Sequence, residues 1–146
     1  MDKNVHADQM AAYLADFIEG AGANRFYMDH IGIYNEMEYD PAYVKILHKE
    51  LLVRHLNTKT ACCDEYGGQG KGAWAIAHAI QSDPALASAV DVIAAHYPQN
   101  KGKLTTTQAA RDSGRPLWSS EDQQNSGSGP YLSRLACRGP DSCAPL

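Results

Sequence analysis

Short apolar segments alternate with segments of helical spacing along the first 122 residues of this chain. The apolar segments are residues 30–34, 58–63, 90–95 and 116–119. The third is a near-continuous apolar run, which is typical of a strand buried on both faces. Alternation of strands with helices predicts parallel strands joined by helical crossovers. The chain is therefore expected to be an α/β protein with about four parallel strands.

Spacing and capping residues predict the helices between these strands. Met10, Leu14, Phe17 and Ile18 recur with the 3.6-residue period of one helical face, and glycines at 20 and 22 are expected to end that helix. Two Asp-Pro pairs, at 40–41 and 83–84, place a capping side chain before a proline and predict two further helix starts. Residues 73–81 and 105–111 are also expected to be helical.

This element order is half of a (β/α)8 barrel, although alternation alone is equally compatible with an open, doubly wound sheet. We expect a partial barrel domain over residues 1–122. Residues 123–146 differ in composition, since they are rich in serine, glycine and proline and show no clear period. They are predicted to be a disordered or loosely attached tail.

Charge and composition argue against several classes of protein. The net charge is −4 and no stretch is strongly basic, which disfavours nucleic acid as the main partner. No apolar run approaches the roughly 18 residues of a membrane span, and the polar first residues show no signal peptide. Cys62 and Cys63 are expected to be buried thiols, while Cys137 and Cys143 lack a metal-binding pattern, so neither a metal nor a cofactor is predicted.

Polar residues follow each of the four predicted strands. They are Asn35 and Glu36, Asp64 and Glu65, His96 and Tyr97, and Ser120, Glu121 and Asp122. Because parallel strands place their carboxyl ends at one edge, where the active sites of such folds lie, these groups are expected to share one rim. Two carboxylates on a rim suit glycoside hydrolysis, in which one protonates the leaving oxygen and the other attacks the anomeric carbon.

Several longer motifs carry a resemblance to a known family. The segment Ile31-Gly32-Ile33-Tyr34-Asn35-Glu36 resembles the strand end that bears the proton donor in glycoside hydrolase family 59, the galactocerebrosidases or galactosylceramidases. Residues 43–47 resemble the helix that follows, and residues 90–98 resemble the family's sixth strand and loop. Residues 117–122, Leu-Trp-Ser-Ser-Glu-Asp, resemble the seventh strand. Tyr34 stands where the family has tryptophan.

The resemblance implies a retaining β-galactosyl hydrolase that removes galactose from galactosylceramide and related sphingolipids in the lysosome. Glu36 would be the proton donor, Glu121 the nucleophile, and Asn35, His96 and Tyr97 would contact the substrate. The resemblance also implies a glycosphingolipid that is presented by a lipid-binding activator protein. The matching segment lacks the family's first three strands and its eighth.

Other interpretations of the same residues stay open. A truncated half-barrel could be catalytically inactive and act as a binding fragment. The glycine-rich residues 67–72 suggest a phosphate loop, but the expected Ser or Thr after Gly70-Lys71 is absent. Asp64 is expected either to bind a hydroxyl group or to cap the next helix. Trp118 is expected to belong to the strand core rather than to a sugar-stacking platform.

Overall fold

A computed structural model of the chain describes residues 6–35, 38–66, 74–96, 99–100, 103–104, 106–121, 135–137 and 143–145. The helices are α1 (Ala7–Ala23), α2 (Pro41–Val53), α3 (Ala75–Ser82), α4 (Pro84–Ser88) and α5 (Gln108–Asp112). The strands are β1 (His30–Gly32), β2 (Lys59–Tyr66), β3 (Val92–His96), β4 (Gln99–Asn100), β5 (Lys103–Leu104), β6 (Leu117–Glu121), β7 (Leu135–Cys137) and β8 (Cys143–Pro145).

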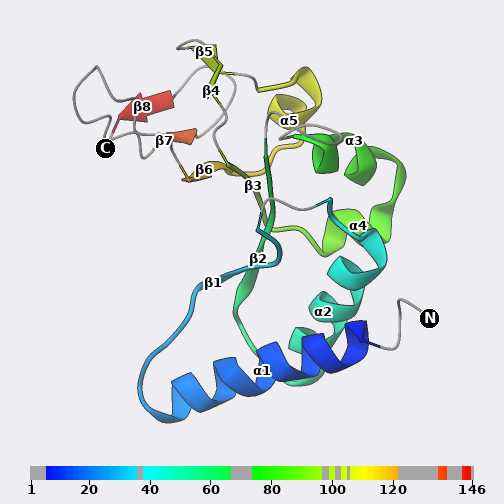
Figure 1. The fold of residues 1–146 in the computed structure, drawn as a ribbon, viewed down its shortest axis with the longest axis vertical. Helices are drawn as coiled ribbons and strands as arrows, with labels where there is room; N and C mark the ends of the chain where they lie inside the picture. The colour runs from blue at the N-terminus through cyan, green and yellow to red at the C-terminus, as the bar shows by residue number, and fades with distance from the viewer. Residues whose placement is uncertain are drawn as a thin grey trace.

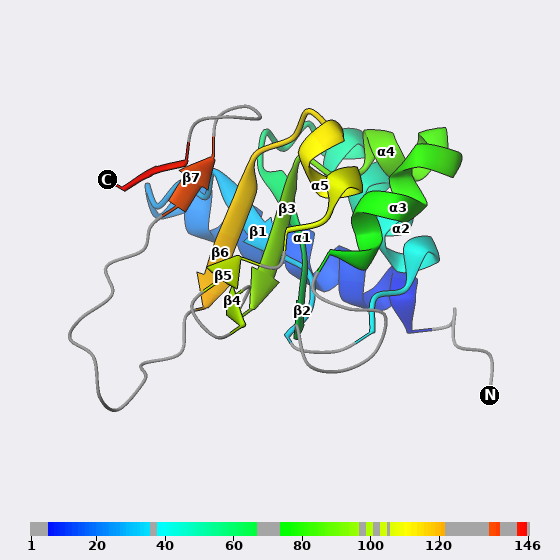
Figure 2. The same ribbon diagram turned by 90° about the horizontal axis from the view of Figure 1, so that it is seen from above.

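The main sheet has the strand order β1-β2-β3-β6-β7-β8. Its first four strands are parallel neighbours, and β7 and β8 add to β6 in antiparallel fashion. Helices α2 to α5 lie on one side of the parallel strands (Figure 1 and Figure 2). The predicted α/β architecture, with four parallel strands and helical crossovers, is confirmed and is compatible with a partial (β/α)8 barrel.

Capping side chains start the helices where the sequence predicts them. Asp40 accepts a hydrogen bond from the Ala42 amide at 2.9 Å, and Asp83 accepts one from Leu86 at 2.9 Å. Each carboxylate satisfies an amide of the first turn that has no partner within the helix. A short β4–β5 hairpin stands where only a loop was expected. The tail from residue 123 contributes β7 and β8, which no periodic pattern predicts.

The buried face of α1 agrees only in part with the predicted one, since Leu14 and Ile18 pack inward but Met10 and Phe17 do not. Its buried residues are Ala7, Ala11, Ala15 and Ile18. Met10 and Phe17 are more than half exposed. Small alanine side chains let α1 approach α2 closely, where Tyr43, Leu47 and Leu51 pack against it. The period was predicted correctly, but the centre of the buried stripe is formed by the alanines, with Leu14 and Ile18 beside them.

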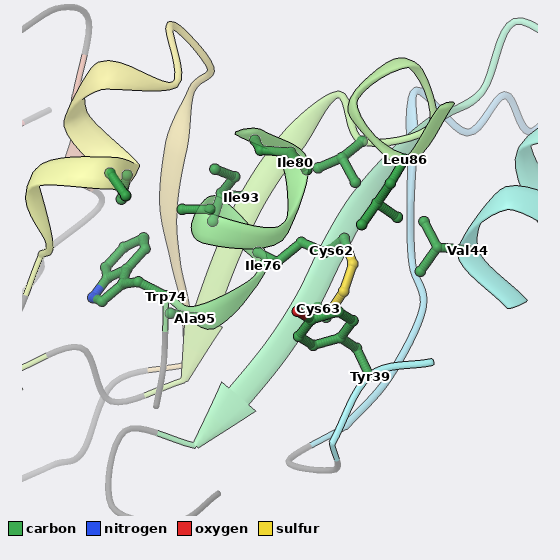
Figure 3. Close-up of a cluster of buried hydrophobic side chains, with 14 of the residues drawn as sticks. Tyr39, Val44, Cys62, Cys63, Trp74, Ile76, Ile80, Leu86, Ile93 and Ala95 are labelled. Carbon is green, nitrogen blue, oxygen red and sulfur yellow. A yellow bond between two sulfur atoms is a disulfide. The ribbon is translucent and has the colours of Figure 1, made fainter. Parts of the chain in front are cut away.

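The largest hydrophobic cluster lies between the sheet and helices α2 to α5 (Figure 3). It joins Ile93 and Leu117 from the strands to Ile76 and Leu86 from the helices. Cys62 and Cys63 are fully buried in it, as expected. They are joined by a disulfide bond, however, so the expectation of thiols was wrong.

The opposite face of the sheet carries a smaller cluster. Ala61 and Ala94 are buried there with Val92, and the Trp118 ring packs against them. The Trp118 ring also meets the His30 ring edge-on, with centroids 4.6 Å apart, across the two intervening strands β2 and β3. Alanines leave room for a large ring on this face. Trp118 therefore packs in the strand core, as expected.

The start of β2 is fixed to the start of β3 by Thr60. Its hydroxyl is fully buried and donates to the Ala89 carbonyl at 2.6 Å, while its amide donates to the Asp91 carboxylate at 2.9 Å. The Asp91 amide donates in return to the Thr60 carbonyl at 3.2 Å. These bonds fix the register in which Ala61 lies opposite Val92.

Within the described part of the chain, no helix is both long and apolar enough for a membrane crossing.

Candidate active site

The carboxyl ends of β2, β3 and β6 bring Asp64, His96, Ser120 and Glu121 together. His96 lies opposite Glu121 in the register of β3 and β6. The sequence predicted that polar groups after these strands would share one rim, and these four residues do. Asn35, three residues beyond the end of β1, is exposed. Glu36 and Tyr97, two of the predicted site residues, lie outside the described residues.

Two irregularities in the sheet shape this rim. Cys63 lies opposite Ala94 and Glu65 opposite Ala95, so Asp64 is an extra residue in β2. Similarly, β6 has an extra residue at Ser120 relative to β3. Bulges of this kind bend a strand and redirect a side chain, and they are common beside active sites.

The two extra residues meet each other across β3. The Ser120 hydroxyl donates a hydrogen bond to Oδ1 of Asp64, although 56 positions separate the two residues in sequence. The backbone of Asp64 has a φ of 54°, in the left-handed region that aspartate tolerates better than most residues. Thus Asp64 bonds a protein hydroxyl. Its alternative role as a helix cap was wrong, because α3 begins eleven residues later, at Ala75, and has Trp74 at its N-cap.

His96 lies between two carboxylates. Its Nε2 is 3.8 Å from Oδ1 of Asp64, and its Nδ1 is 3.5 Å from Oε2 of Glu121. The His96 side chain is only 6% exposed and that of Asp64 13%, whereas that of Glu121 is 49% exposed. Of these three side chains, that of Glu121 is accordingly the one that a molecule from solvent can reach most easily.

Burial controls the charge of Asp64. Removing its carboxyl group from water raises its pKa, whereas the Ser120 hydrogen bond and the nearby His96 ring lower it, and the Glu121 charge raises it further. Desolvation is the largest of these effects, so the net direction is upward. A buried carboxyl group with a raised pKa beside polar partners is a common feature of functional sites.

Tyr34 ties the end of β1 to the start of α2. Its hydroxyl accepts a hydrogen bond from the Asp40 amide at 3.0 Å, and its ring meets the Tyr43 ring edge-on at 5.8 Å. Burial raises the pKa of Tyr34 to about 12, against a smaller lowering by the Asp40 amide. These contacts hold both ends of the segment that contains Asn35 and Glu36.

Gly32 and Ser120 are site residues that the sequence did not single out by role. A Cβ atom at position 32 would lie 3.2 Å from Oδ2 of Asp64, tighter than most real contacts of that kind. Glycine therefore makes room for the carboxyl group. The Ile-Gly-Ile motif was the available signal for Gly32, whereas nothing in the sequence pairs Ser120 with Asp64.

The chemistry available at this rim is that of carboxylates, an imidazole and hydroxyl groups. Among the residues that the structure describes, no group of three or more His, Cys, Asp or Glu side chains is arranged to hold a metal ion. An exposed carboxylate beside a buried imidazole can act as a nucleophile or as a base. The carboxylate of Glu36 would have to supply the second group that glycoside hydrolysis requires.

Comparisons with known proteins identify the family. The sequence matches glycosyl hydrolase family 59 over residues 1–138. It is 37% identical to galactocerebrosidase of Danio rerio over 114 residues, which are 77% of this chain and 16% of that protein. It is 36% identical to galactocerebrosidase of Homo sapiens over 126 residues, which are 81% of this chain and 16% of that protein.

The extent of the family match decides the assignment. It includes β1, β2, β3 and β6 and all four residues of the rim. The chain spans only about 16% of the length of these curated relatives. Because the family match covers most of the chain and agrees with its α/β architecture, this chain belongs to glycosyl hydrolase family 59.

Proposed function

We propose that this chain is the part of a retaining β-galactosyl hydrolase that carries both catalytic carboxylates. Glu121 attacks the anomeric carbon of the galactosyl group and displaces the aglycone, while Glu36 protonates the leaving oxygen. Glu36 then takes a proton from the water that attacks the galactosyl-enzyme, which releases galactose and restores the free Glu121 carboxylate. The supporting observation is the exposed Glu121 carboxylate at the carboxyl end of β6, beside the ends of β2 and β3.

The name galactocerebrosidase, which the relatives carry, supports galactosylceramide and related sphingolipids as substrates. Asn35 precedes Glu36 and is exposed. We propose that its side chain contacts the 2-hydroxyl group of the sugar. His96 and Tyr97 complete the substrate contacts. We further propose the lysosome as the compartment and a lipid-binding activator protein as the partner that presents the substrate.

Chemical rescue distinguishes the two glutamates. In a protein that contains this chain within a complete barrel, Glu121→Gly and Glu36→Gly should each lower hydrolysis of an aryl β-galactoside by several orders of magnitude. Azide should restore turnover in both variants. Without the nucleophile, azide attacks directly and gives the α-galactosyl azide. Without the acid/base residue, azide attacks the galactosyl-enzyme and gives the β-azide.

Glu38→Gln is the matched control, since Glu38 is an exposed glutamate only two residues from Glu36. It should hydrolyse the galactoside at close to the rate of the unaltered protein. Undiminished hydrolysis in Glu121→Gly, or the same azide anomer from both glycine variants, would contradict the assignment. Galactoside binding with no hydrolysis by the unaltered protein would instead favour a non-catalytic binding role.

A further inference from the structure

Asp64 is linked to Glu121 in two ways, through Ser120 and through His96. One passes through Ser120, whose hydroxyl bonds Oδ1 of Asp64 and whose backbone directly precedes Glu121. The other passes through the imidazole of His96, which faces Oδ1 of Asp64 with Nε2 and Oε2 of Glu121 with Nδ1. We propose that Asp64 is a positioning residue that fixes the Glu121 carboxylate through both connections. This inference rests on the proposed role of Glu121 as the nucleophile.

The geometry favours positioning over direct contact with substrate. Exposure decreases from 49% at the Glu121 side chain to 13% at Asp64 and 6% at His96. The imidazole distances of 3.5 and 3.8 Å exceed those of good hydrogen bonds, so that connection is mainly electrostatic. The Ser120 hydrogen bond is the direct mechanical connection. Asp64 therefore acts on Glu121 from behind the surface that a sugar would occupy.

The strand pairing is irregular at the point where Asp64 and Ser120 meet. Two extra residues, one on each strand beside β3, are needed for Asp64 and Ser120 to meet. Asp64 also adopts a left-handed backbone and keeps a carboxyl group largely out of water, and both features cost free energy. Gly32 supplies the space for that carboxyl group from the neighbouring strand. Three strands thus contribute to the placement of one buried side chain.

The first test measures coupling between these residues in the 146-residue chain itself. The probe is the ¹⁵N and ¹³C chemical shifts of the His96 ring, recorded for Glu121→Gln in the unaltered background and in an Asp64→Asn background. If Asp64 holds the ring against Glu121, the shift change caused by Glu121→Gln should fall at least about twofold in the Asp64→Asn background. An equal change in both backgrounds would overturn the positioning of His96 by Asp64.

Two further variants keep this test decisive if Asp64→Asn does not fold. Ser120→Ala removes only the hydroxyl connection, and Gly32→Ala displaces the carboxyl group while keeping every polar side chain. Each should reduce the coupling in the same direction as Asp64→Asn. Asp112→Asn, an exposed aspartate on α5, is the matched control and should leave the coupling unchanged. Full coupling in both Ser120→Ala and Gly32→Ala would also overturn the inference.

The second test measures attack by Glu121 in a protein that contains this chain within a complete barrel. A 2-deoxy-2-fluoro-β-galactosyl fluoride transfers its sugar to the nucleophile and releases fluoride without needing an acid. Asp64→Asn should lower the maximal labelling rate about 10- to 100-fold, because small displacements of a reacting group cost rate of that order. The reagent concentration at half-maximal rate should change less than about threefold, and Asp112→Asn should label normally.

The labelling results separate the two proposals. An unchanged labelling rate in Asp64→Asn would overturn the positioning role and leave Glu121 as the nucleophile. Absence of label on Glu121 in the unaltered protein would overturn the proposed function and, with it, the catalytic part of this inference. The chemical-shift coupling would then still decide whether Asp64 positions His96.

Discussion

Removing the Thr60 hydroxyl tests whether buried hydrogen bonds fix the register beneath the site. Thr60→Val keeps the branched shape of a fully buried side chain and deletes the hydroxyl that donates to the Ala89 carbonyl at 2.6 Å. It also removes two longer contacts of that hydroxyl, each 3.3 Å, with the carboxylate and the amide of Asp91. Asp91 keeps its bond from the backbone amide of residue 60, so one buried carbonyl loses its donor. Leaving a buried polar group unpaired costs about 1–3 kcal/mol, and we expect a loss of free energy of unfolding in that range.

Urea unfolding followed by circular dichroism measures this loss. With a slope of about 2 kcal/mol per molar urea, a loss of about 2 kcal/mol moves the midpoint down by about 1 M without changing the slope. Thr106→Val is the matched control, since Thr106 lies half-buried in the loop before α5, and should stay within about 0.5 kcal/mol. If Thr60→Val is no less stable than Thr106→Val, the hydroxyl does not hold the β2–β3 register.

Three further predictions concern the core, the charge at the rim and the β1 end. Leu47→Ala should lower the free energy of unfolding by about 2–5 kcal/mol because Leu47 is fully buried between α1 and α2. Leu52→Ala, at a 60% exposed position, is the control and should cost under about 0.5 kcal/mol in the same urea assay. Equal losses in the two variants would refute the packing argument. Burial raises the pKa of Asp64 in the folded state. The stability of the unaltered chain relative to Asp64→Asn should therefore be greatest below the ordinary aspartate pKa and should fall as pH rises through the folded-state pKa. A stability difference that stays constant from pH 3 to 7 in urea titrations would contradict this direction. Tyr34→Phe should remove from the ultraviolet titration the tyrosine that ionises at about pH 12. It should also lower the free energy of unfolding by about 0.5–1.5 kcal/mol, because the Asp40 amide loses its acceptor. Loss of a group that ionises near pH 10 would show that Tyr34 is not buried as described.

Local signals predicted the order of the elements well. The two Asp-Pro pairs start helices through the carboxylate caps that their sequence implies, since a cap depends only on residues within one turn. The apolar run at 90–95 predicted the buried strand β3, which the structure places at Val92–His96, because an element buried on both faces has little polar surface to expose. Conversely, periodicity alone could not tell which stripe of α1 is buried. The choice of Ala11 and Ala15 over Met10 depends on how closely α2 approaches.

The α/β class, the parallel strands and the polar groups after each strand can all be inferred from the amino-acid sequence. It also carried the motifs that place the chain in its family, because these are properties of contiguous residues. The partnership of Asp64 with Ser120, the space left by Gly32 and the position of His96 between two carboxylates were decided only by the tertiary structure. They depend on two bulges, in β2 and in β6, which are far apart in sequence. A bulge is set by how neighbouring strands pair rather than by local propensity.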